Sequence, residues 1–289
     1  MKKIVFCFLT GILLLTYTFT ANAFVRYEDK HPQKRKDIYI TGFIDYPPFG
    51  FVEHPNAKIY GKFTTLFQPM IDELAKENNL RIFYDLQKKD FQTLVQEVRK
   101  GELDIILGAY HQTEFFRGLE LIYPAAINNP ITIFMLPNRI NEVKSVDDLK
   151  KLKGVRITKE VYSDYINEQL KQFNMEEVDT SYKMFEKLFT KQVDYILVSH
   201  YYGLIEAIKF GLREQVAIAK QTLWQIPMFI GVSKLSRERK MLSQKLTRYI
   251  EKPENQKAFQ DGVAKMIADF AKNAEGIVPP TFGLEKSDN

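Results

Sequence analysis

Two histidines lie where they could do chemistry, because each directly follows an apolar run that predicts a strand. His111 and His200 follow such runs, and two carboxylates, Asp45 and Glu114, also lie close to predicted strand ends. Imidazole changes its charge near neutral pH, so two histidines facing one cleft beside a carboxylate can carry out acid–base chemistry. A single histidine at a helix start is more often a cap or a solvated residue, and we therefore rank binding above catalysis.

Aromatic side chains gather near the same predicted strand ends. Rings in such places can sandwich a flat or apolar solute. Each ring taken singly is more readily explained as a core residue, so only the group indicates a binding cleft. The group comprises Tyr46, Phe49, Tyr110, Phe115, Phe116, Tyr201, Tyr202 and Trp224.

Two segments ninety residues apart repeat one design and would position these side chains. Residues 91–108 and 181–198 each show apolar residues at helical spacing, then a polar corner, then an Asp that opens a short apolar run. This order predicts a helix followed by a strand in both segments. We expect two α/β lobes on one plan, with ligands bound where the carboxyl ends of their strands face each other.

Other segments complete the two lobes. Pro47 and Pro48 end the first strand in an extended turn. Ser145 and Asp148 form a capping box at the start of a short helix. The two last helices are expected to pack on the first lobe, and the tail from Gly276 to be loosely ordered. The predicted elements are strands 38–43, 81–86, 103–108, 131–135, 155–157 and 225–233, and helices 63–78, 161–173, 236–250 and 253–270.

The start of the chain reads as a secretory signal. Lys2 and Lys3 precede a mostly apolar run that ends in Ala21-Asn22-Ala23. This pattern predicts a signal peptide over residues 1–23, cleaved after Ala23, with the product in the periplasm. An uncleaved anchor helix is the alternative, but threonines dilute the run. Residues 24–37 are polar, without periodicity, and are interpreted as a flexible lead-in.

Composition excludes several classes of function. The chain has 289 residues, of which 45% are hydrophobic, enough for one or two full cores. Its one cysteine, Cys7, lies in the predicted signal, so the mature chain would have neither a disulfide nor a thiolate nucleophile. The net charge of +5 is small and spread along the chain, which is no footprint for nucleic acid. No phosphate loop or metal-ligand spacing is seen, so we expect no cofactor and no metal.

The order of five motifs resembles a known family. The motifs are residues 45–49 after the first strand, 101–104 at the start of the strand 103–108, 108–110 leading to Thr113 and Arg117, 146–149 at the second lobe, and 229–234 at the return crossing. Together they resemble bacterial periplasmic solute-binding protein family 3, which serves polar amino acid uptake. The resemblance implies an α/β, two-lobe periplasmic-binding-protein-like fold of type II with two hinge-crossing strands. The first lobe would be 38–130 plus 230–289, and the second 131–229.

The resemblance also implies a set of ligand-binding residues. In members that bind α-amino acids, an arginine after the strand that corresponds to 103–108 binds the carboxylate of the ligand. Here Arg117 stands one residue later than in the family pattern, and the resemblance gives it that role. The resemblance and the strand ends together predict a site made of Asp45, Tyr46, Phe49, Gly108, Tyr110, Thr113, Arg117, Ser199 and Tyr202.

Two departures from the family pattern bear on the solute. The family's aspartate that pairs with the ligand's α-ammonium is replaced by Ser199, and residues 158–163 replace its Gly-Ser/Thr turn. A hydroxyl cannot neutralise a desolvated ammonium. Both changes argue against an ordinary α-amino acid, unless Asp45, Glu160 or Asp164 supplies the charge. We expect a small polar or anionic solute.

These observations predict a monomeric solute-binding protein that captures its solute by hinge closure and delivers it to the membrane permease of an ABC-type importer. Two alternatives remain open at this point. The chain could serve a membrane receptor as a ligand sensor, or it could be a periplasmic dehydratase-like enzyme on the same fold.

Overall fold

The structure is a computed structural model, and it describes residues 35–42, 46, 48–49, 52–54, 57–60, 63–85, 89, 91–110, 117–158, 160, 162–220 and 222–282. The chain divides into Met1–Lys34 and Arg35–Asn289, and everything below concerns the second unit. Several predictions lie outside the described residues: the signal peptide with its cleavage site, most of the lead-in, and Asp45, His111, Thr113, Glu114, Phe115 and Phe116.

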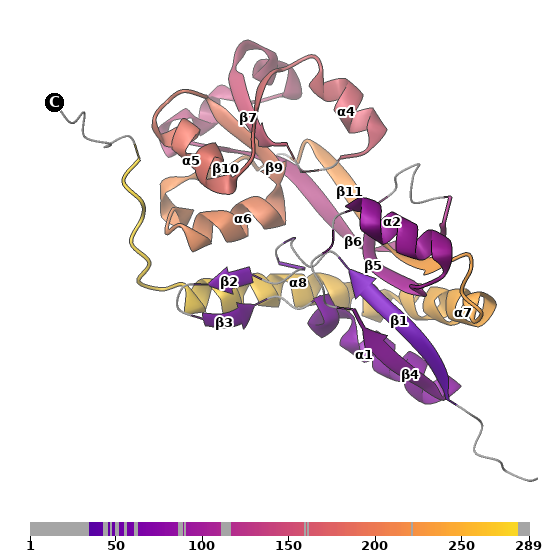
Figure 1. Cartoon of the computed structure of the whole chain (residues 1–289). Coiled ribbons are helices and arrows are strands. Elements are labelled where there is room, and N and C mark those ends of the chain that lie inside the picture. Colours follow the sequence, from indigo (N-terminus) through magenta and orange to yellow (C-terminus); the bar gives the residue numbers. More distant parts are fainter. Residues whose placement is uncertain are drawn as a thin grey trace, which may run out of the picture. The chain divides into compact units, whose positions relative to one another are not determined.

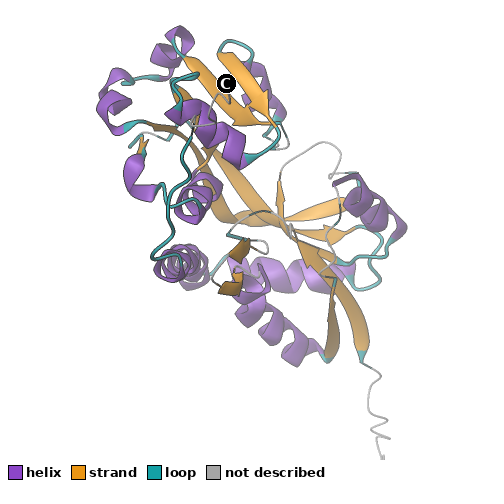
Figure 2. Ribbon diagram, turned by 60° about the vertical axis from the view of Figure 1, so that its left-hand side comes forward, coloured by secondary structure: helices purple, strands orange, loops and turns teal. Residues whose placement is uncertain are grey.

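One mixed sheet runs through both lobes (Figures 1 and 2). Its order is β4 (Leu80–Tyr84), β1 (Lys36–Gly42), β5 (Ile105–Tyr110), β11 (Trp224–Ser233), β6 (Leu119–Met135), β9 (Tyr195–Ser199), β7 (Lys153–Ile157) and β8 (Asn174–Val178), with β10 (Ala217–Ile218) paired to β6. Strands β4, β1 and β5 are parallel, as are β9, β7 and β8, whereas β11 and β6 run antiparallel to their neighbours. A separate hairpin joins β2 (Val52–His54) and β3 (Ala57–Tyr60).

Helices cover the two groups of parallel strands. We call β4, β1 and β5 with α1 (Phe63–Asn78), α2 (Phe91–Lys100) and α7 (Arg239–Ile250) the first lobe. We call β9, β7 and β8 with α4 (Asp164–Leu170), α5 (Ser181–Phe189) and α6 (His200–Lys209) the second lobe. The long strands β6 and β11 pass between them as the predicted crossings. The two-lobe α/β fold class is therefore confirmed, while the exact lobe boundaries stay a prediction.

The predicted repeat is present in atomic detail. Asp104 and Asp194 each accept a hydrogen bond from the backbone N–H of the neighbouring parallel strand, at Tyr39 (2.9 Å) and Lys153 (2.7 Å). Their own N–H groups donate to the carbonyls of the same two residues, at 2.9 and 2.7 Å. One aspartate thus aligns two strands in each lobe, which explains why both segments place it before the strand.

The corner between helix and strand is also shared. Gly101 and Lys191 both have positive φ, +73° and +60°, and the residues after them donate to carbonyls five residues earlier at 2.9 Å. This geometry is a helix C-terminal turn that favours glycine. Lys191 adopts it with a Cβ, at a cost that glycine avoids.

Element bounds follow the predictions with some differences. The crossing predicted at 131–135 belongs to a strand that begins at Leu119, and the helix predicted at 161–173 is confined to Asp164–Leu170 by the cap at Ser163. The segment after the capping box is a 3₁₀ turn, Val146–Lys151, in which Asp148 accepts from the Ser145 N–H at 2.9 Å. Two further 3₁₀ turns, Pro137–Glu142 and Arg213–Gln215, were not predicted, nor were β8 and the β2–β3 hairpin.

The C-terminal part departs most from expectation. Helix α8 (Pro253–Asn273) begins on the first lobe, but Phe270 and Ala274 pack on α6 of the second. The tail after Gly276 continues along the second lobe as far as Phe282 rather than standing loose. The apolar residues that make these contacts are too few and too widely spaced to form a pattern in the sequence.

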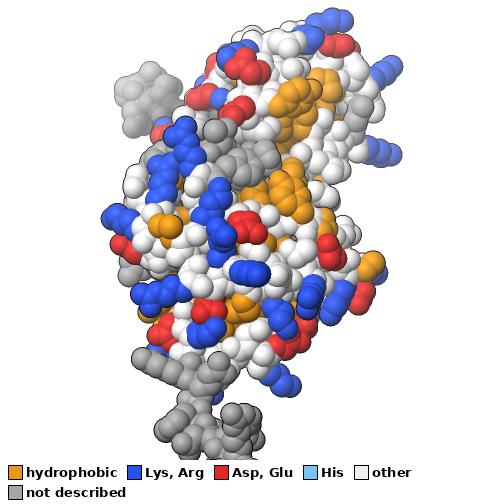
Figure 3. Space-filling view, turned by 90° about the vertical axis from the view of Figure 1, so that its right-hand side faces the viewer, with side chains coloured by type: hydrophobic (Ala, Val, Ile, Leu, Met, Phe, Trp, Pro, Cys, Tyr) orange, Lys and Arg blue, Asp and Glu red, His pale blue; other side chains and the backbone are white. Residues whose placement is uncertain are grey.

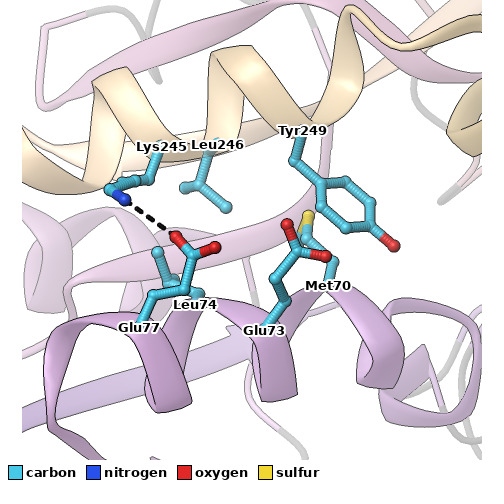
Figure 4. A pocket seen from close by; sticks show the side chains of 7 residues that line it. All are labelled: Met70, Glu73, Leu74, Glu77, Lys245, Leu246 and Tyr249. Atoms are coloured by element: carbon cyan, nitrogen blue, oxygen red, sulfur yellow. Dashed lines mark hydrogen bonds and ion pairs between the residues drawn. The ribbon is translucent and has the colours of Figure 1, made fainter.

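Three further features limit where a site can be. Figure 4 shows a shallow seam between α1 and α7, where Lys245 pairs with Glu77 at 2.7 Å; its charged side chains face solvent, so it is a helix–helix contact. On the face in Figure 3, lysines and arginines are interspersed with acidic side chains, and exposed apolar side chains form separate patches. Within the described residues, no helix could span a membrane and no cluster of side chains could hold a metal ion.

Candidate functional site

The candidate site lies where strand ends of both lobes meet the crossing strand β6. Each lobe and the crossing contribute polar side chains to it. They are Tyr46 after β1, Tyr110 at the end of β5, Asn129 in β6, Glu160 after β7 and Ser199 at the end of β9.

Glu160 is the charged centre of this site. Its Oε1 accepts from the backbone N–H of Ser199 at 2.8 Å and from the hydroxyl of Tyr46 at 3.3 Å, and its Oε2 accepts from the hydroxyl of Tyr162 at 2.9 Å. Burial raises the pKa of Glu160 to about 7, and these three hydrogen bonds and the more distant Arg156 only partly counter that effect. Among the described residues no lysine, arginine or histidine forms an ion pair with this carboxylate.

Asn129 connects the two lobes through the crossing strand. It is fully buried, and its Nδ2 donates to the hydroxyls of Tyr46 (3.1 Å) and Tyr110 (3.2 Å). Its Oδ1 accepts from the hydroxyl of Ser199 at 2.7 Å. A single amide therefore fixes two tyrosines of the first lobe and the end of β9 in the second.

Aromatic rings form the wall of the site around Tyr46. Its ring stacks on Tyr202 of the second lobe, with centroids 5.7 Å apart, and on Phe49 at 6.4 Å. It meets Tyr110 edge-on at 6.2 Å, while Phe49 meets Tyr201 edge-on at 5.9 Å. Burial raises the pKa of both Tyr46 and Tyr110, so the two hydroxyls stay protonated over the physiological range.

Gly108 acts on the site through the backbone. Strand β5 has one residue more than β11 between the pairs Leu107–Ile230 and Ala109–Phe229, and Gly108 is that residue, with φ of +82°. Such a bulge turns the strand beyond it. Gly108 thereby sets the direction in which Tyr110 leaves the strand.

Five of the predicted site residues come together in the structure, and one does not join them. Tyr46, Phe49, Tyr110, Ser199 and Tyr202 lie in the contacts described above. Arg117 is exposed in the turn before β6. Val232 pairs with both Ile105 and Glu120, so the register places Arg117 beyond the amino end of β5, whereas Tyr110 is at its carboxyl end. The carboxylate-binding role of Arg117 stays a prediction. The ligand-binding roles of Asp45 and Thr113, which lie outside the described residues, also stay predictions.

Two other predicted residues lie at the border of the site. His200 begins α6 with its ring edge-on to Tyr201 at 5.5 Å, and burial lowers the pKa of its imidazole, so it is neutral at pH 7. Trp224 packs edge-on against Phe173 rather than in the aromatic wall.

The sequence interpretation gave Asn129 and Tyr162 no role and named Glu160 only as an alternative charge. A signal for Asn129 was present, because the pair Asn128-Asn129 interrupts an apolar crossing strand. Glu160 stands where the family's turn is replaced, and a charged residue at a strand end was the clue to its importance.

Comparison with known proteins rests on structure alone. No family model and no curated protein matches the chain. Among solved structures, an amino acid ABC transporter substrate-binding protein from Streptococcus pneumoniae, bound to L-arginine, superposes with a TM-score of 0.57 at 14% identity, over 80% of this chain and 94% of that one. The fold is that of the type II periplasmic-binding proteins.

Two other solved structures of this fold agree. A mutant of ArgBP from T. maritima gives a TM-score of 0.57 at 15% identity, covering 80% of this chain and 95% of that one. The ancestral amino acid-binding protein AncCDT-1, described as a precursor of cyclohexadienyl dehydratase, gives 0.56 at 14%, with coverage of 80% and 95%. The predicted resemblance to the amino-acid-type solute-binding proteins is thus confirmed at the level of the fold.

Proposed function

We propose that this chain is a solute-binding protein that holds a small polar solute with a protonated amine between its lobes, and that Glu160 accepts the ammonium. The observation that carries this proposal is the buried carboxylate of Glu160, which lies at the lobe junction and forms no ion pair within the part of the chain that the structure describes.

The electrostatics of the site favour a cation over an anion. A buried carboxylate costs several kcal/mol unless it is paired and hydrogen-bonded. The pKa of about 7 means that three hydrogen bonds leave part of this cost uncompensated. An ammonium would complete the pair, whereas an anionic solute would be repelled. The environment of Glu160 therefore favours an amine as the solute, in place of the anionic solute expected from the sequence.

Glu160 also answers the objection raised by Ser199. The serine is neutral, but its backbone N–H holds the Glu160 carboxylate 2.8 Å away, so the negative charge stands beside the position where the family has its aspartate. An amino acid is therefore a suitable solute. Structural neighbours are described as bound to L-arginine or L-glutamate, which agrees with this class.

Hinge closure explains how binding is signalled. Tyr46 of the first lobe touches Glu160 and Tyr202 of the second, so these contacts form only when the lobes are close. A solute that bridges the lobes adds further contacts to the closed form and shifts the population toward it. We propose that the closed monomer, in the periplasm, is recognised by the permease of an ABC-type importer or by a membrane receptor.

The test is calorimetry of the purified protein against a panel of amino acids and other amines. Glu160→Gln should weaken binding of the best amine by about 30-fold or more, because a charge-assisted hydrogen bond in a closed cleft is lost. Glu168→Gln, on the exposed face of α4 in the same lobe, is the matched control and should bind as wild type. Equal affinity of wild type and Glu160→Gln, or a preference for solutes without an amine, would refute the proposal.

A second function is favoured by one observation. A carboxyl with a pKa of about 7 is suited to general acid catalysis, and one structural neighbour is described as a precursor of a dehydratase. Mass spectrometry after long incubation separates the two functions. Recovery of the bound amine unchanged supports binding, whereas a product that disappears with Glu160→Gln but not with Glu168→Gln would establish an enzyme.

A further inference from the structure

Helix α8 is anchored in both lobes. In its first half the ring of Phe259 packs on Phe67 of α1, with centroids 5.0 Å apart, and Val263 is buried in the same core. In its second half Phe270 and the following Ala274 are buried against α6 of the second lobe. Figure 1 shows the helix running past α1 at one end and below α6 at the other.

The tail extends this contact along the second lobe. Gly211, at the end of α6 with φ of +68°, lies so close to the tail that a Cβ there would stand 2.7 Å from the carbonyl oxygen of Ile277. Phe282 then stacks on Phe189 of α5, with centroids 5.2 Å apart and planes 20° from parallel, and packs on Tyr182 at 5.4 Å. Figures 1 and 2 show the segment rising beside α6 to α5.

The composition of the tail suits a tether. Pro279 and Pro280 favour an extended backbone without secondary structure, so the segment spans the distance from α8 to α5 at low conformational cost. Val278 lies between Ile277 and Pro279, whose backbone atoms adjoin Gly211, but its own side chain is 84% exposed and takes no part in this packing.

These contacts add a third connection between the lobes. Strands β6 and β11 are the two crossings between the lobes, and α8 is a single helix whose two halves are buried on different lobes. Opening the cleft must therefore slide Phe270 across α6 or detach the tail from α5. Either movement exposes apolar surface, which opposes opening.

We propose that residues 270–282 are a strap that holds the second lobe in the arrangement where Tyr46 reaches Glu160, and that the rings of Tyr182 and Phe189 together with Gly211 are the surface on which it docks. The strap acts on the protein without solute. Its role is therefore independent of which solute binds and of whether Glu160 receives an amine.

The test measures the distance between the lobes in the absence of solute. In a Cys7→Ser background, dyes on cysteines at Lys76 of α1 and Tyr165 of α4, both exposed, report the separation by single-molecule energy transfer. Phe282→Ala should shift part of the population to a longer distance. Val278→Ala, an apolar truncation in the same segment with an exposed side chain, should leave the distribution as in wild type.

A second variant and a second measurement secure the result. Deleting residues 277–289 should produce a larger open population than Phe282→Ala. Hydrogen exchange of the α6 amides should become faster in both, while exchange in β1 and β5 stays unchanged and shows that the first lobe remains folded. The proposal is overturned if Phe282→Ala and the deletion, folded by this criterion, keep the wild-type distance distribution, or if Val278→Ala opens the protein as much as Phe282→Ala.

Discussion

The pH dependence of stability offers a sharp test of the Glu160 environment. The pKa of this carboxyl is about 7 in the folded protein and 4.5 ordinarily. Between these values the folded protein holds a proton that the unfolded chain has released, so stability falls as pH rises. The contribution of this group is complete below pH 4.5 and is lost as pH passes 7, which amounts to about 3 kcal/mol at 1.36 kcal/mol per pKa unit.

Glu160→Gln isolates this contribution because glutamine has no proton to lose. Urea unfolding, followed by fluorescence of the single tryptophan, Trp224, gives the free energy of unfolding of both proteins at pH 4.5 and pH 8. The free energy of unfolding of Glu160→Gln, taken relative to that of wild type, should rise by about 3 kcal/mol from pH 4.5 to pH 8. The lowered pKa of His200 has the opposite effect on stability, but it is present in both proteins and cancels in the comparison.

Glu168→Gln serves as the control, since its carboxylate is exposed and the difference from wild type should not change with pH. If the stability difference between Glu160→Gln and wild type were the same at pH 4.5 and pH 8, the carboxylate would not be desolvated as described.

The pH dependence of ligand affinity tests the same pKa independently. An amine needs the ionised form, which falls from about half of the protein at pH 7 to about a tenth at pH 6, so its affinity should fall about fivefold over this range and about tenfold for each further pH unit, with proton release on binding.

Two further predictions concern single positions. Lys191→Gly should raise the free energy of unfolding by about 1 kcal/mol because it removes a Cβ from a residue at φ of +60°, whereas Gly101→Ala at the equivalent corner should lower it; unchanged urea midpoints would refute this. Ser199→Asp should destabilise the protein by about 2 kcal/mol or more at pH 8, because two buried carboxylates would adjoin, and Glu160→Gln in the same chain should relieve the loss. An Asp variant that is as stable as wild type and binds amino acids more tightly would instead support the family pattern.

The sequence predicts elements whose signal is local. The helix over 63–78 has the predicted bounds, and the repeated helix–strand units are present because amphipathic spacing and a polar corner suffice to specify them. The aromatic group at the strand ends was also predicted as a group, and Tyr46, Phe49, Tyr110, Tyr201 and Tyr202 are indeed in contact. Pattern analysis works here because strand ends in an α/β sheet converge whatever the individual side chains are.

The features that were missed depend on contacts between distant segments. Tyr46 and Glu160 are 114 residues apart, and Ser199 and Asn129 are 70 apart, so no local period marks them. The tail is expected to be loose from its place at the end of the chain, and its few apolar residues, among them Ile277, Val278 and Phe282, show no periodic spacing that would indicate packing. The partners of Ile277 and Phe282 on α5 and α6 become visible only when the second lobe is folded.

The Ser199 position shows why a functional residue should be judged by its charge in space rather than by its place in a motif. Counting along the strand found a neutral hydroxyl where the family has an aspartate, and this implied a different class of solute. In the structure the backbone N–H of that serine holds the carboxylate of Glu160, and Tyr162, two residues after Glu160, braces its other oxygen. A backbone N–H is present at residue 199 whatever its side chain is. The end of β9 can therefore bind a carboxylate from another segment, such as that of Glu160, when its own side chain has none. In the proposed function the carboxylate of Glu160 thus takes the place of the family's aspartate, and a negative charge that would attract an amine stands at the same strand end.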